Sequence, residues 1–74
     1  MENTLRCVVL AKFRSIADFA RAMKWDRKKA SRIVNRIQYP SAKEMEQMAI
    51  VLEISNADSF VHIFLPTVSA LWNN

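Results

Sequence analysis

Three consecutive segments of the chain repeat one spacing of apolar side chains, and this spacing constrains the fold more than any other feature. Each segment places apolar residues at positions i, i+3, i+4 and i+7, which lie along one side of an α-helix. No stretch alternates with the period of a β-strand over more than a few residues. The pattern therefore predicts three amphipathic helices, each with one buried stripe. The three stripes are Ile16, Phe19, Ala20 and Met23; Ala30, Ile33, Val34 and Ile37; and Met45, Met48, Ala49 and Leu52.

Residues that favour helix N-termini mark where these segments begin. Ser15, Asp26 and Ser41 each precede one apolar segment, and each is a strong N-cap type. Ser41 is followed at the third position by Glu44, which is the pattern of a capping box. Pro40 disfavours a helical conformation in the residue before it, so the middle helix should end ahead of it.

Two further helices are predicted on either side of these three. Upstream, Leu5, Val9 and Phe13 form an i, i+4, i+8 seam, and downstream Asn56 is placed to cap a short helix that Pro66 should end. The sequence thus predicts a single, compact all-α domain of five short helices over residues 1–74. The expected helices cover residues 4–13, 16–23, 27–36, 42–52 and 57–64, followed by an apolar tail at 67–74.

The composition places the chain among small globular proteins. Its 74 residues are 51% hydrophobic, which is too apolar for a disordered tail, and it has no glycine, so its turns must be made by other residues. No apolar run approaches the roughly 20 residues that cross a bilayer, and the N-terminus does not resemble a signal peptide. A single cysteine, Cys7, excludes an internal disulfide, so we expect a reducing, cytoplasmic location.

The two parts of the chain carry opposite charge. All eleven Lys and Arg lie in residues 1–43 beside three acids, which leaves +8, whereas residues 44–74 hold four acids and no Lys or Arg, which leaves −4. Such an asymmetry predicts one surface directed at a polyanion and another that faces away from it.

The predicted third helix concentrates this positive charge. The stretch from Trp25 through Arg36 contains five basic side chains, and Asp26 is its only acid. With the apolar stripe inward, Lys28, Arg32 and Asn35 point outward, in a helix that fits the major groove of DNA. A solvated basic face without a partner is the alternative. DNA contact is favoured because the acids that normally intersperse such a face are missing.

Only two residues, Lys24 and Trp25, separate the second predicted helix from the cap of the third, which is typical of a helix-turn-helix. From about Leu5 to Phe64 the sequence also resembles the Cro and phage-repressor type of helix-turn-helix, often called Xre-like. The resemblance rests on "SIADFARAMKWDRKKASRIVNR" followed by "YPSAKEMEQMAIVLEIS". It is strongest with small phage-encoded members of the family.

The resemblance implies roles for individual residues. Arg27, Lys28 and Arg32 occupy the positions that usually read bases, and Lys29 is expected to share that work or to bind phosphate. The implied contacts to the DNA backbone are Ser15, Ser31, Asn35, Arg36, Gln38 and Tyr39.

Three positions depart from the family pattern. Lys24 replaces the usual turn glycine, Arg36 replaces the glycine of an "E-N-G" triplet, and Ile16 stands where a polar residue is frequent. If Lys24 or Arg36 must adopt a left-handed conformation, each costs on the order of 1 kcal/mol.

Other conspicuous side chains have simpler interpretations. Trp25 is expected to fill the edge of the core, and the helically spaced methionines to pack inside it. Cys7 is expected to be a buried thiol, and His62 to lie at or near the surface without a second metal ligand. One histidine and no glycine loop offer no catalytic set, so we expect neither an enzyme nor a cofactor or metal, and no small-molecule ligand is evident.

The expected function is that of a small transcriptional regulator, a repressor of phage or mobile-element origin that occludes an inverted-repeat operator as a homodimer. Val68, Leu71 and Trp72 are too apolar for a free tail, so they either complete the core or form the dimer interface. Two alternatives stay open: a protein-interaction module such as an antirepressor or phage inhibitor, and an RNA-binding protein. Few aromatic residues accompany the basic ones, which makes RNA the weaker alternative.

Overall fold

The computed structural model describes the backbone of residues 3–72 and the side chains of residues 3–64. Over this range the chain is all-helical with no strand, so the predicted all-α class and the number of helices are confirmed. None of these helices is long and apolar enough to cross a membrane. The helices are α1 (Thr4–Lys12), α2 (Ile16–Met23), α3 (Arg27–Val34), α4 (Ala42–Val51) and α5 (Ala57–Trp72).

Side-chain caps fix where the helices begin, as the sequence predicts. The Ser15 hydroxyl accepts from the Asp18 amide at 3.2 Å, and the Asp26 carboxylate accepts from the Lys29 amide at 2.8 Å. At α4 the capping box is complete, because Ser41 Oγ accepts from the Glu44 amide and Glu44 Oε1 accepts from the Ser41 amide. Each cap satisfies amides that have no partner inside the helix.

The predicted apolar stripes meet in one core. Phe19, Ile33 and Met48, from α2, α3 and α4, are almost wholly excluded from solvent, and Phe64 of α5 joins them. Trp25 packs at the edge of this core, with its ring perpendicular to that of Phe19 at 6.0 Å between centroids, which confirms its predicted role. The buried core comprises Leu5, Val9, Phe19, Ala20, Met23, Ala30, Ile33, Val34, Met45, Met48, Leu52, Ile63 and Phe64.

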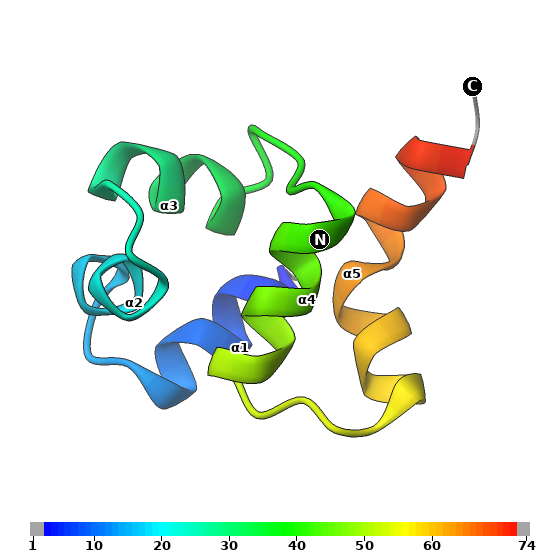
Figure 1. Ribbon diagram of the computed structural model, residues 1–74, viewed down its shortest axis with the longest axis horizontal. Coiled ribbons are helices and arrows are strands. Elements are labelled where there is room, and N and C mark those ends of the chain that lie inside the picture. The colour runs from blue at the N-terminus through cyan, green and yellow to red at the C-terminus, as the bar shows by residue number, and fades with distance from the viewer. Residues whose placement is uncertain (1–2, 73–74) are drawn as a thin grey trace.

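The helices are arranged so that α3 lies along one edge of the molecule (Figure 1). α2 packs against α3 and α4, and α1 packs against α2, α3 and α5. In the view of Figure 1, α4 and α1 lie between the α2–α3 pair and α5. One long side of α3 is therefore left without a neighbouring helix.

Three helices end in the same way, through a left-handed residue that is not glycine. Lys24, Arg36 and Glu53 have φ values of 60°, 60° and 57°. At the end of α2, the Lys24 amide donates to the Arg21 carbonyl at 3.1 Å and the Trp25 amide to the Ala20 carbonyl at 2.9 Å. This pair of bonds is a Schellman motif, and the same pair recurs at Arg36 and at Glu53. The left-handed conformations considered for Lys24 and Arg36 are thus both present, and Glu53 is a third.

The prediction that Pro66 ends the fifth helix is wrong, because α5 continues to Trp72 and includes most of the expected tail. A proline removes one helical hydrogen bond and its ring presses on the carbonyl four residues earlier, which kinks a helix without forbidding it. The ribbon of α5 changes direction about midway, as expected for an interior proline (Figure 1).

Two predicted burials are also wrong. Ile37 is 77% exposed because α3 ends before it and the left-handed Arg36 turns the chain, so the helical spacing no longer applies there. Cys7 is exposed because the core face of α1 is formed by Leu5 and Val9, and Cys7 lies between them on the other side of the helix. His62 is exposed, as expected.

Replacing Lys24 by glycine should stabilise the protein. Glycine adopts the left-handed conformation without the Cβ clash, so the free energy of unfolding should rise by up to about 1 kcal/mol, reduced by the greater freedom of glycine in the unfolded chain. Lys24→Ala is the matched control, because it removes the same charge but keeps the Cβ. Urea unfolding of both variants measures the difference, and equal stability of the two would contradict the interpretation of this turn.

Candidate nucleic-acid interface

The exposed side of α3 gathers the predicted base-reading side chains. Ala30, Ile33 and Val34 are buried on the inner side of the helix, and this fixes its rotation about its own axis. Lys28 and Arg32 are consequently exposed on the outer side, and Arg27 is exposed beside them in the first turn of the helix. A shallow, open concavity of the surface is lined by these three basic residues and by one serine: Arg27, Lys28, Arg32 and Ser31.

The charges on this side have no counterpart within the described part of the protein. Arg27, Lys28 and Arg32 form no ion pair or side-chain hydrogen bond with any described residue, whereas Lys12 and Arg21 elsewhere are paired with acids. The first turn of α3 contains no acid, and cations there oppose the helix dipole by about 0.3–1 kcal/mol each. Arg27 and Lys28 lack an ion-pair partner among the described residues, so they carry this cost, and an external anion would relieve it.

Lys29 differs from its basic neighbours. Its ammonium group pairs with the Glu44 carboxylate of α4 and lies 4.8 Å from the centre of the Trp25 ring. The side chain is half-buried and directed at α4 rather than at the outer side of α3. In this structure Lys29 joins α3 to α4 and to the turn before α3, and it is not gathered with the other three.

The pKa of the Glu44 carboxyl is lowered below its ordinary value of 4.5. The main cause is the hydrogen bond from Lys29, followed by that from the Ser41 amide, and both favour the ionised form. Glu44 therefore serves the cap of α4 and the contact to α3 together.

The other end of α3 is held by polar side chains. The Arg6 guanidinium on α1 donates to Asn35 Oδ1 at 2.7 Å, and Asn35 Nδ2 donates to Ser31 Oγ at 3.3 Å. Asn35 and Ser31, two of the predicted backbone contacts, are thus linked to each other and to α1. Arg6 was not among the predicted site residues.

Asn3 is a second residue that the sequence prediction missed. Its Oδ1 accepts from the Arg6 amide as the N-cap of α1 and also from Arg36 Nε, each at 3.1 Å. Its Nδ2 donates to the Val34 carbonyl at the end of α3, at 2.8 Å. Asparagine before a helical pattern indicates an N-cap, but no local pattern reveals its contacts to residues more than 30 positions away.

The remaining predicted contacts lie around α3 rather than on it. Ser15 is half-buried and occupied as the cap of α2, and its hydroxyl hydrogen is not used in that bond. Gln38 is half-buried and Tyr39 is 55% exposed, both in the segment after α3. Residues 68, 71 and 72 belong to the helical backbone of α5. The side chains expected at a dimer interface, those of Val68, Leu71 and Trp72, lie outside the described residues.

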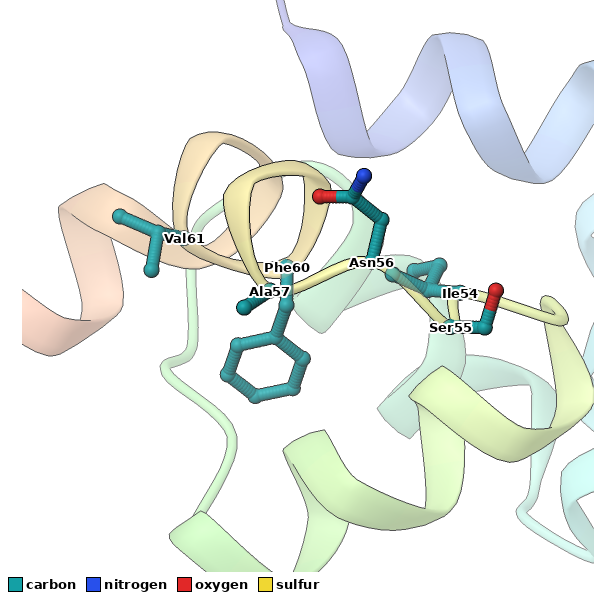
Figure 2. Close-up of a pocket in the computed structure, with 6 residues that line it drawn as sticks. All are labelled: Ile54, Ser55, Asn56, Ala57, Phe60 and Val61. Carbon is teal, nitrogen blue, oxygen red and sulfur yellow. The ribbon is translucent and has the colours of Figure 1, made fainter.

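A second hollow, at the junction of α4 and α5, has a different character (Figure 2). Figure 2 shows the Phe60 ring projecting from the first turn of α5 on the side of α4, and Val61 also lines the hollow. Asn56 Oδ1 already caps α5 by accepting from the amides of Asp58 and Ser59. The lining residues include no charged group, so this hollow offers nothing to hold an ion. Among the described residues no three metal-ligating side chains lie together.

The Glu44–Lys29 pair should make stability depend on pH. Because the folded pKa lies below 4.5, the ionised carboxylate stabilises the protein above pH 4.5, and this contribution is lost as pH falls through the folded pKa. Glu44→Gln keeps an oxygen for the Ser41 amide but loses the charge. We expect the variant to be less stable at pH 7 and to approach the original protein in acid. Glu46→Gln, on the exposed side of α4, is the control, and a deficit of Glu44→Gln that is independent of pH would contradict the role of the pair.

Comparison with known proteins adds no relative to this description. No protein-family model, no curated protein sequence and no solved structure matches the chain.

Proposed function

We propose that the protein binds double-stranded DNA in a sequence-dependent manner through the outer side of α3. The observation that carries the proposal is a set of three exposed cations that pair with no described residue, on a side of α3 that no other described helix covers: Arg27, Lys28 and Arg32. An α-helix fits the major groove, where arginine and lysine donate to the O6 and N7 atoms of guanine.

The surroundings of α3 support this proposal. α2 packs directly against α3, and Lys24 and Trp25 form the short turn between them, as in a helix-turn-helix. Ser31, Asn35 and Arg36 lie at or beside the same helix, where groups that bind phosphate fix the register of a protein on DNA. Lys29 is assigned to the contact with α4 and not to base reading.

The biological role follows as part of the same proposal. A small protein that inserts α3 into the major groove acts as a transcriptional repressor by covering the site where polymerase binds. Two copies on an inverted repeat would place their α3 helices about one DNA turn apart, which raises affinity and makes the target palindromic. A phage or mobile-element origin agrees with the resemblance described for the sequence.

Selection of bound duplexes from a random library at physiological salt, followed by affinity measurements with substituted proteins, tests the proposal. Arg32→Ala should cost about 1–3 kcal/mol on the selected duplex and relax the preference at one base pair, if Arg32 reads a base. Lys12→Ala is the matched control, because Lys12 is paired with Glu53 at the end of α4. It removes one positive charge from the contact between the end of α1 and the turn after α4.

Two results would contradict sequence-dependent recognition by α3. One is a selection that enriches no sequence, with binding that disappears as salt rises. The other is equal losses for Arg32→Ala and Lys12→Ala on every duplex. A basic surface without sequence preference would then favour a protein partner, as in an antirepressor.

A further inference from the structure

The start of the chain and the end of α3 are joined through one side chain, Asn3. The carboxamide makes three hydrogen bonds at once, to the Arg6 amide, the Val34 carbonyl and Arg36 Nε. A carboxamide has one acceptor oxygen and one donor group, and here both are engaged, with groups from α1, from the end of α3 and from the turn after it. Asn3 is therefore half-buried between α1 and the end of α3 although it lies next to the N-terminus.

The contact with Arg36 has a particular geometry. Arg36 is left-handed, with φ of 60°, so its side chain leaves the chain in a direction that a helical residue would not take. Asn3 holds the guanidinium through Nε, and the two terminal nitrogens donate to no described residue. A guanidinium anchored in this way keeps donors for a phosphate, and its orientation is fixed before the phosphate arrives.

We infer that Asn3 is a positioning residue of the DNA interface: it orients Arg36 to bind a backbone phosphate beside the end of α3. This inference rests on the proposed function, because it assigns a role within the same surface. Asn3 does not touch DNA itself and acts through Arg36. Its bond to the Val34 carbonyl keeps α3 in place while its oxygen orients the guanidinium.

Asn3→Ser separates this role from capping. Serine caps helices about as well as asparagine, but its hydroxyl is one atom shorter and cannot serve the Arg6 amide, Val34 and Arg36 together. On the selected duplex we expect affinity to fall about tenfold, the loss of a charge-assisted hydrogen bond. The slope of log affinity against log salt should also fall by about 0.9, the value for one phosphate contact.

A double-mutant cycle with Arg36→Ala measures the coupling between Asn3 and Arg36 in DNA affinity. A purely structural role of Asn3 would give no such coupling. If Asn3 acts through Arg36, then Asn3→Ser should cost little affinity once Arg36 is alanine. Asn3→Asp is the second variant. It keeps an oxygen for the cap and for Arg36, but it loses the donor to Val34 and adds a negative charge that competes with phosphate for the guanidinium. Its salt slope should therefore fall at least as far as that of Asn3→Ser, and an unchanged slope would count against the inference.

The outcomes distinguish this inference from the proposed function. If the original protein selects a duplex but Asn3→Ser keeps its affinity and salt slope, the inference is overturned and the proposed function stands. Equal losses in the presence and absence of the Arg36 side chain would overturn it in the same way. If the original protein selects no duplex, the proposed function and the inference about Asn3 are both contradicted.

Discussion

The connections from α2 to α3, from α3 to α4 and from α4 to α5 each begin with a left-handed residue that carries a full side chain, and the arrangement of these helices depends on these turns. Lys24 turns the chain from α2 into α3, Arg36 leads it out of α3, and Glu53 leads it out of α4. Each conformation costs roughly 1–2 kcal/mol for a residue with a Cβ. The cost is met by the Schellman hydrogen bonds and by the core that the turns allow to close, with Phe19 and Ile33 brought together from α2 and α3. The turn at Lys24 sets the angle between α2 and α3, and this angle leaves the outer side of α3 facing solvent.

α3 is fixed at both ends by polar contacts while one side of it stays open. At its start, Lys29 lies between the Trp25 ring and Glu44, and at its end Asn3 binds the Val34 carbonyl. A helix held in this way loses little freedom when it binds a rigid partner, which favours affinity. The basic side chains of α3 that remain exposed are those that make no contact with another described helix. This division explains why Lys29 lies outside the proposed interface although it has the same charge as Arg27 and Lys28, which lie on it.

The sequence predicts much of this fold because its local signals agree. The caps at Ser15, Asp26 and Ser41 and the apolar spacing place four helices to within two residues. The prediction fails where it extends a local rule too far: Pro66 lies inside α5, and Ile37 lies beyond the end of the third stripe. It also cannot find Asn3 or Arg6, or the pairing of Lys29, because these depend on contacts between helices. The outward side of α3 is predictable from period and charge, whereas the groups that orient it are not.

The central claim is that the open side of α3 is the surface that meets DNA. Its most direct test is an NMR titration of the labelled protein with a selected duplex, recording which backbone amides shift. Binding should perturb residues 27–36 and the amide of Ser15, and leave the hollow around Phe60 unchanged. Perturbations centred on Phe60 and Val61, with the amides of α3 unchanged, would contradict the account.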